Sequence, residues 1–201
     1  MARLFLVRHG ITEFNSSRRF MGYSDIDLSV SGFKQAERLC GRLAGEKFDA
    51  VYSSDLKRAL STAEIITSDN NVDIIECSEL REMNYGYLEG LKFEEINQRY
   101  PEVAKSISGF NFRTMVFPGG ESFMEFIERT RKFLDRLKKY KSSQTILVVS
   151  HNGALRVLIC CLLKLDFEYW RQFRIDNASL SILQTHDRGV IINLLNDTSY
   201  L

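Results

Sequence analysis

The chain alternates between short apolar runs and longer segments whose apolar residues recur at helical spacing. Residues 3–7 and 145–150 are continuous apolar runs, which is typical of parallel strands covered by other structure on both faces. The remaining runs are shorter, and the last two flank a turn at Asp187-Arg188-Gly189. The runs that we expect to form strands are 3–7, 49–53, 72–76, 145–150, 180–184 and 190–195.

Segments between these strands carry an apolar stripe at the spacing of an α-helix. In 32–43 the stripe follows Ser31, which we expect to cap the helix. Residues 154–164 are nearly apolar throughout, so this helix is expected to be buried. The predicted helices are 32–43, 56–68, 121–140 and 154–164. The alternation of strands and helices predicts an α/β fold, a three-layer αβα sandwich with a mainly parallel central sheet.

Residues 84–120 interrupt this alternation, because they hold both prolines and several of the glycines. Short helices are expected near 92–99 and 101–108. We interpret 84–120 as an inserted, lid-like region over the edge of the sheet, within a single domain that spans residues 1–201. The chain has no internal repeat and no low-complexity linker.

The composition mainly excludes classes of protein and partner. Lys+Arg 27 against Asp+Glu 26 gives a net charge of +1, so nothing in the charge favours nucleic acid or a membrane surface as partner. No stretch approaches the roughly 18 apolar residues that span a bilayer, and no basic-then-apolar leader opens the chain, so we expect a cytoplasmic protein. Four irregularly spaced cysteines do not indicate a disulfide framework. The oligomeric state, including a homodimer, is left open.

Two of the three histidines lie at the ends of predicted strands. His9 follows the first strand and His151 follows the run 145–150, and each precedes a glycine-containing turn. In an α/β sheet, ligands bind at the edge formed by the carboxyl ends of the strands. The positions of these histidines therefore predict a functional site at that edge.

Two arginines accompany the histidines. Arg8 ends an apolar strand, where an unpaired guanidinium is costly to bury. Arg58 lies in the first or second turn of a predicted helix, where a cation opposes the helix macrodipole unless an anion is bound there. Arginines can hold the oxygens of a phosphoryl group through bidentate bonds, while one imidazole attacks phosphorus and the other bonds the transferring group.

The arginines also affect the protonation of His9, because nearby positive charge disfavours an imidazolium. His9 is therefore expected to remain a free base near neutral pH. A backbone carbonyl bonded to one ring nitrogen would direct the other at the substrate. The leaving alkoxide still needs a proton donor, and Glu82 lies just after a predicted strand at the same edge. Taken alone, a glutamate at such a position is more commonly an ordinary surface residue.

Five sequence blocks in order together resemble the histidine phosphatase superfamily, which has the phosphoglycerate mutase-like fold. The resemblance extends over residues 4–160. The blocks are Arg8-His9-Gly10 with Thr12, Glu13 and Asn15; Tyr52-Ser53-Ser54-Asp55-Leu56 with Arg58; Leu80-Arg81-Glu82; Pro118-Gly119-Gly120-Glu121-Ser122; and Val149-Ser150-His151.

The resemblance implies a role for each of the residues derived above. His9 would become the phosphohistidine, and Arg8, Arg58 and His151 would form the phosphate pocket. Glu82 would protonate the leaving group and later activate water. The resemblance implies no metal and no organic cofactor.

Further site residues follow from the resemblance alone. Asn15 would bond the phosphate, and Gly22 would lie beside the substrate. The chain departs from the family at Ile11, where glutamate is usual, and at Asn152, where glycine is usual. Asn152 is assigned to the substrate site: its side chain could be tolerated, could narrow the pocket, or could strain a backbone that needs a positive φ.

Other chemistries are disfavoured. Asp25-Ile26-Asp27 matches an aspartate-nucleophile motif but does not end an apolar strand, and Cys77 lies too close to Arg81 for a cysteine phosphatase. The three histidines lack the spacing of metal ligands.

Two alternatives exist within the family. A phosphoglycerate mutase needs a longer insertion to exclude water, whereas only 68 residues separate Glu82 from His151 here. A catalytically silent binding protein would be expected to lack one of the five core residues, and all five are present.

The expected activity is therefore a phosphomonoesterase acting on a small phosphate ester. The stretches 89–102 and 196–199 resemble α-ribazole phosphatases of cobalamin synthesis, which makes α-ribazole 5'-phosphate the first expectation. Broad-specificity and phosphoserine phosphatases share much of this pattern. Several aromatic residues could line a pocket for a nucleoside-like leaving group: Phe14, Phe20, Tyr23, Tyr85, Tyr87, Phe110 and Phe112.

Overall fold

The two longest apolar runs lie side by side in the middle of the sheet. In the computed structural model, which describes residues 2–70, 72–109 and 112–201, β1 pairs in parallel with β4, and Arg8 lies opposite Ser150. The described residues form a six-stranded sheet in the order β3-β2-β4-β1-β5-β6. Its strands are β1 (Arg3–Arg8), β2 (Ala50–Ser53), β3 (Ile74–Glu76), β4 (Thr145–Ser150), β5 (Leu180–His186) and β6 (Gly189–Asp197). The pairings among β1 to β4 are parallel, whereas β5 and β6 pair antiparallel, which confirms the predicted mainly parallel sheet.

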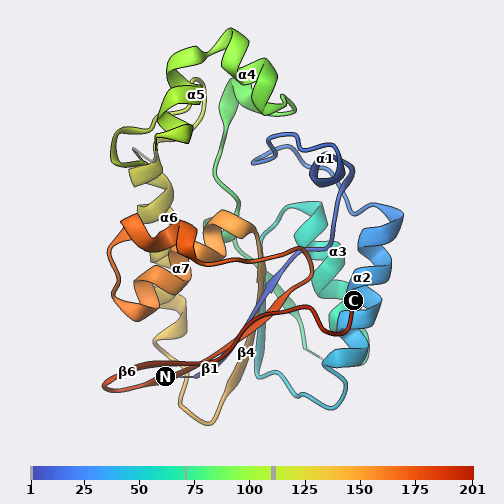
Figure 1. The fold of residues 1–201 in the computed structure, drawn as a ribbon. Helices are drawn as coiled ribbons and strands as arrows, with labels where there is room; N and C mark the ends of the chain where they lie inside the picture. Colours follow the sequence, from blue (N-terminus) through green and yellow to red (C-terminus); the bar gives the residue numbers. More distant parts are fainter. Residues whose placement is uncertain (1, 71, 110–111) are drawn as a thin grey trace.

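Helices cover both faces of the sheet, as the predicted sandwich requires (Figure 1). Leu4 and Leu6 of β1 pack in one core with residues of α6 (Phe123–Leu137) and α7 (Asn152–Leu163). The alternate residues, Phe5 and Val7, pack in a second core with α2 (Val30–Arg42) and α3 (Lys57–Ile66). Because side chains alternate along a strand, one apolar run serves both cores.

Residues between β3 and α6 form short elements beyond the carboxyl ends of the strands, where Figure 1 shows α4 and α5 at the top. A third core joins Leu88, Ile96 and Phe117 of this region to α6 and α7. The other short elements of the described chain are α1 (Glu13–Ser16), α4 (Phe93–Arg99), α5 (Pro101–Ser108) and 3-10 turns at Ser78–Leu80, Gly86–Leu88, Phe112–Thr114 and Phe167–Gln172.

Three helices start two residues away from the predicted positions: α2, α7 and α6, which begins at Phe123 instead of residue 121. The N-cap of α2 is Ser29, whose hydroxyl accepts the N–H of Gly32 at 3.2 Å, so the prediction of Ser31 was wrong. The apolar periodicity did not reveal the first turn of α2, because Val30 and Ser31 are both exposed. α7 begins at Asn152, two residues before the predicted start, which puts His151 at its N-cap.

All four cysteines are free thiols. Within the described part of the chain, no helix combines the length and the apolar character needed to cross a bilayer.

Candidate active site

The parallel pairing of β1 with β4 brings the two strand-end histidines together. The N–H of His9 donates to the carbonyl of Ser150 at 3.0 Å, and the ring centroids of His9 and His151 are 5.1 Å apart. Both side chains are buried. The placement that the sequence predicted for this pair therefore follows directly from the strand register.

His9 is held as one tautomer by its own chain. Its Nδ1 donates to the carbonyl of Gly10 at 2.7 Å, which leaves the lone pair on Nε2. Burial lowers the pKa of His9 well below its ordinary value, and the charges of Arg58 and Arg8 lower it further. The ring is thus a neutral base with one free nitrogen at neutral pH.

His151 has protein partners on both ring nitrogens. Nδ1 accepts from Nε of Arg58 at 3.2 Å, so Nε2 carries the proton and donates to the hydroxyl of Ser54 at 2.8 Å. Burial, followed by the charge of Arg58, lowers its pKa well below the ordinary value. Contact with a phosphoryl group, as the resemblance implies, would require that the bond to Ser54 be shared or exchanged.

Arg58 is fully buried at the second position of α3. Besides His151, its guanidinium donates to the carbonyls of Ser24 at 2.8 Å and Gly22 at 2.7 Å, so three of its five N–H groups are occupied. Burial lowers its pKa to about 10, which leaves it charged at neutral pH. Two donors remain free to bind an anion.

The aspartate motif near this helix has a structural explanation. Asp25 accepts the N–H of Lys57 at 2.8 Å and so supplies an anion at the start of α3. Asp27 accepts from the hydroxyl of Ser61 at 2.7 Å. The exposed Lys57 also pairs with Asp25, 3.7 Å away, so its charge does not require a bound ligand.

Arg8 is half-buried at the end of β1. One terminal nitrogen donates to the carbonyl of Ile175 at 2.8 Å, whereas Nε is buried without a partner. Burial lowers its pKa to about 10. Unsatisfied donors on a charged side chain beside His9 favour an anionic ligand.

Gly22 is enclosed by protein on both sides of its peptide. Its N–H donates to the carboxylate of Glu89 at 2.9 Å, while its carbonyl accepts from Arg58. A Cβ at this position would lie 1.9 Å from the carbonyl oxygen of Met83, so only glycine allows this approach. The contact with substrate that the family resemblance implies for Gly22 stays a prediction.

Glu89 was not singled out from the sequence, although it orders the whole loop at Gly22. Its carboxylate also accepts from the backbone of Tyr23 at 2.9 Å and of Ser24 at 3.0 Å. These bonds fix the carbonyls to which Arg58 donates. Glu89 begins the stretch 89–102 that resembles α-ribazole phosphatases, but nothing in the neighbouring sequence identified the loop at Gly22 as its partner.

Asn15 is oriented by a residue from the other end of the chain. Its Oδ1 accepts from the backbone of Thr12 at 3.1 Å and from Nδ2 of Asn177 at 3.1 Å. Asn177 also donates to the carbonyl of His9 at 3.2 Å. The carbonyl end of Asn15 is therefore occupied, which leaves its amide N–H groups to donate to a phosphate.

Glu82 is 7% exposed and is held by backbone donors. Its carboxylate accepts from Met83 N at 3.0 Å and from Gly153 N at 2.9 Å. Gly153 is the second residue of α7, where backbone N–H groups lack helical partners. A Cβ on Gly153 would lie 2.4 Å from Glu82 Oε1, so this glycine makes the carboxylate cap possible.

Arg129 of α6 holds the loop that carries Glu82. Its guanidinium donates to four carbonyls, those of Ser78, Glu79, Arg81 and Glu82, at 3.1–3.2 Å. It also forms an ion pair with Glu121 at 2.7 Å. Sequence reasoning missed Arg129, because its position in an amphipathic helix is also that of an ordinary surface cation.

Asn152 is the first residue of α7 and has helical backbone, so the alternative of a positive φ is wrong. Its side chain lines two adjoining cavities, which agrees with the alternative of a narrowed pocket. The first cavity, of about 300 Å³, is also lined by Arg8, Asn15 and Glu82. The second, of about 200 Å³, shares Glu82 and Asn152 with the first.

The aromatic residues proposed for a substrate pocket divide into groups. Phe14, Phe20 and Tyr85 line one or both cavities. Tyr23 instead packs against the guanidinium of Arg81, and Tyr87 is largely exposed. Phe110 and the side chain of Phe112 lie outside the described part of the structure.

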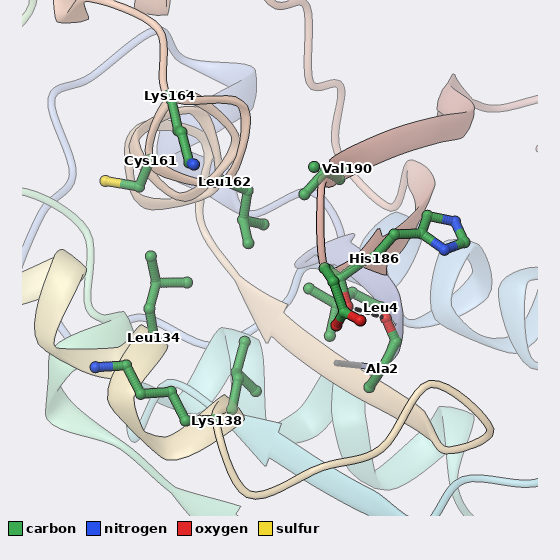
Figure 2. A pocket seen from close by; sticks show the side chains of 13 residues that line it. Ala2, Leu4, Leu134, Lys138, Cys161, Leu162, Lys164, His186 and Val190 are labelled. Atoms are coloured by element: carbon green, nitrogen blue, oxygen red, sulfur yellow. Dashed lines mark hydrogen bonds between the residues drawn. The ribbon is translucent and has the colours of Figure 1, made fainter.

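His186, the third histidine, belongs to a different place. It lines a cavity of about 250 Å³ between the amino end of β1 and the turn that joins β5 to β6, together with apolar residues such as Leu134 and Leu162 (Figure 2). None of the predicted site residues lines this cavity. Within residues 2–70, 72–109 and 112–201, no group of three or more His, Cys, Asp or Glu side chains is arranged to hold a metal ion.

The chain is similar to a known protein family and to several of its members. Residues 4–198 match the model of the histidine phosphatase superfamily (branch 1). Phosphoserine phosphatase 1 of Hydrogenobacter thermophilus is 36% identical over 208 residues, covering 100% of this chain and 95% of that protein. The adenosylcobalamin/alpha-ribazole phosphatase of Escherichia coli is 33% identical over 196 residues, covering 96% and 95%. The crystal structure of the alpha-ribazole phosphatase from Shigella flexneri has a TM-score of 0.91 at 31% identity, covering 97% of this chain and 96% of that one.

The chain therefore belongs to branch 1 of the histidine phosphatase superfamily and has the phosphoglycerate mutase-like fold. It is a phosphomonoesterase of this family.

Proposed function

We propose that the protein hydrolyses a small phosphorylated metabolite through a phosphohistidine formed on Nε2 of His9. The observation that carries this proposal is the state of His9, a buried neutral ring whose Nδ1 is bonded to Gly10 and whose Nε2 is free. Arg8, Arg58 and Asn15 provide donors for the phosphoryl oxygens.

The first step transfers the phosphoryl group. The Nε2 lone pair of His9 forms the N–P bond, the ester P–O bond breaks, and Glu82 gives its proton to the leaving oxygen. The imidazole gains positive charge in this step. The carbonyl of Gly10 stabilises that charge because it already accepts the Nδ1 proton.

The second step reverses the roles. A water molecule attacks phosphorus while Glu82 takes its proton, the N–P bond breaks, and the electron pair returns to Nε2. Phosphate leaves, His9 is neutral again, and Glu82 holds the proton for the next turnover. The cycle balances without any further reactant.

Two substrates follow from the relatives. The expectation of α-ribazole 5'-phosphate is supported by the relatives from Escherichia coli and Shigella flexneri. Phosphoserine is supported by the relative from Hydrogenobacter thermophilus at a similar identity. Both are phosphomonoesters of small alcohols, so the chemistry proposed for His9 is the same for either.

The test is to trap the intermediate with ³²P-labelled phosphomonoester, quenching the reaction in alkali. We expect a protein-bound label that is stable in alkali and lost in acid, as for a phosphoramidate. His9→Ala should remove the label and lower kcat by about a thousandfold or more. His186→Ala, at the remote cavity, is the matched control and should keep both. Full activity in His9→Ala, or a label lost in alkali instead of acid, would contradict the proposal.

A further inference from the structure

Arg156 is a cation beside the candidate site that has no ion-pair partner among the residues that the structure describes. It lies on α7, one turn after Asn152, and is half-buried. Its Nε is buried without a hydrogen bond, and among the described ion pairs none includes Arg156. Burial lowers its pKa; the charge of Glu82 acts in the opposite direction, and that of Arg171 lowers the pKa further. A half-buried guanidinium with an unsatisfied donor is stabilised further by an anionic ligand.

Trp170 adds a second unsatisfied donor on the same wall. The residue is 8% exposed, and its indole Nε1–H is buried without an acceptor. The ring contacts two guanidinium groups, Arg156 at 5.9 Å and Arg171 at 5.5 Å from its centroid. An indole nitrogen can only donate, so this group also requires an acceptor from a ligand.

Both groups line the smaller cavity, which adjoins the phosphate site at Glu82. Arg171 and Asn152 line it as well, and Oδ1 of Asn152 is buried without a donor. The remaining walls are largely apolar: Phe20, Met83, Tyr85, Ile107, Met115, Phe117. The cavity therefore combines two guanidinium groups, an indole N–H and one amide carbonyl, with the carboxyl group of Glu82 at its border with the phosphate site.

We propose that this cavity is the leaving-group subsite and that it selects phosphomonoesters whose alcohol carries a carboxylate. The inference rests on the function proposed above and narrows its substrate class. A carboxylate can accept from Arg156 and from the indole N–H together, whereas Oδ1 of Asn152 accepts from an amino or hydroxyl group on the neighbouring carbon.

A neutral, nucleoside-like leaving group fits this cavity less well. It would bury Arg156 further without supplying a charge to pair with it, and a site built to bind a polar group rejects ligands that lack that group. The structure thus favours the acidic alcohol of phosphoserine over α-ribazole.

Steady-state kinetics on matched esters test the subsite in the unmodified protein. O-Phosphoserine and O-phosphoethanolamine differ only in the carboxylate, so the ratio of their kcat/KM values isolates its effect. We expect phosphoserine to be favoured by about 10- to 100-fold, the range for a charge-assisted hydrogen bond. 3-Phosphoglycerate, which keeps a carboxylate but has no amino group, should also exceed phosphoethanolamine. Equal values for the matched pair, or faster hydrolysis of α-ribazole 5'-phosphate, would overturn the proposal.

Variants then identify the groups responsible. Arg156→Gln should reduce the preference for phosphoserine to a few-fold or less, mainly through KM, and Arg156→Lys should restore part of it because the charge returns. Trp170→Phe keeps an aromatic ring but removes the donor, and should reduce the preference by several-fold. Arg131→Gln, which removes an exposed cation paired with Glu128, is the matched control and should leave the preference unchanged.

The labelling experiment separates the two proposals. If all esters label His9 but the protein shows no preference for the carboxylate, the subsite proposal fails and the phosphohistidine mechanism stands. If no ester labels His9, both proposals fail together. A preference that persists undiminished in Arg156→Gln would also refute the role of this cavity.

Discussion

At the scale of single residues, Glu82 combines two tasks. The same carboxylate that lines both cavities also caps α7 through the N–H of Gly153. An ionised carboxylate has about four lone-pair sites, and two of them are occupied by Met83 and Gly153. The remaining sites can carry the proton that the leaving group needs, while the backbone holds the carboxyl group in position.

Replacing Glu82 tests the acid role separately from the cap. Glu82→Gln keeps one oxygen that can accept from Gly153 N, but its NH2 group then faces the N–H of Met83, so the melting temperature should fall modestly while the cap of α7 is retained. It removes the transferable proton, so kcat/KM for alkyl phosphates should fall by about 10²- to 10⁴-fold. Aryl phosphates with acidic leaving groups should lose much less, because they leave without protonation. A series of esters of graded leaving-group pKa measures this difference, and an equal loss across the series would exclude the acid role.

Sequence reasoning reached the residues that stand at strand ends or helix starts. His9, Arg8 and Arg58 were identifiable because their chemistry conflicts with the local pattern of apolar positions. Ser54, Asn177 and Arg156 gave no such conflict. Ser54 and Asn177 act through partners distant in the sequence, such as His151 for Ser54, and the unsatisfied Nε of Arg156 is visible only in the folded chain.

At the scale of elements, α6 positions the acid loop, although none of its residues lines either cavity of the candidate site. Arg129 joins this helix to the four carbonyls at 78, 79, 81 and 82, and Glu121 pairs with its charge. These bonds attach α6 to the segment that follows β3 and leads to Glu82. Arg129 is therefore a positioning residue for Glu82.

Arg129→Met should destabilise the fold by about 2–4 kcal/mol, because Glu121 and the carbonyls lose a charged donor. It should also lower kcat for alkyl phosphates by about tenfold and steepen the dependence on leaving-group pKa, as in Glu82→Gln. Denaturant unfolding and the graded ester series measure the two effects. Arg131→Met on the same helix is the control. A loss of stability with an unchanged leaving-group dependence would show a purely structural role.

The order and type of the main elements were predictable, since strand runs and helical stripes differ in period. The residues at which the helices begin were less predictable. α7 begins inside the turn after His151 because Glu82 supplies its cap from another segment, and no local residue signals this. The side-chain cap of α2 was one of two nearby serines, and only the hydrogen bond to Gly32 identifies Ser29.

At the scale of the whole molecule, the two buried histidines couple stability to pH. Both have pKa values well below the ordinary value in the native state, so the unfolded chain binds more protons as the pH falls below about 6.5. The free energy of unfolding therefore decreases as the pH falls below this value, by up to about 2.7 kcal/mol per pH unit for the two histidines together.

Urea unfolding at pH 7.5, 6.5 and 5.5 measures this loss above the range in which most carboxylates titrate. The double variant His9→Gln/His151→Gln should show a much flatter dependence, whereas His186→Gln, which alters an exposed histidine, should match the parent chain. The same slope in the parent chain and the double variant would contradict the prediction.

The two cavities meet at a shared wall made of Phe20, Glu82, Tyr85 and Asn152. The alcohol released in the first step and the water needed in the second must therefore approach phosphorus from the same side, next to the same carboxylate. Departure of the alcohol then comes before hydrolysis, and an alcohol that lingers or rebinds competes with water for the phosphoryl group. The rate at which the alcohol leaves the smaller cavity therefore sets the ratio of two outcomes. The enzyme either releases phosphate or returns the phosphoryl group to an alcohol.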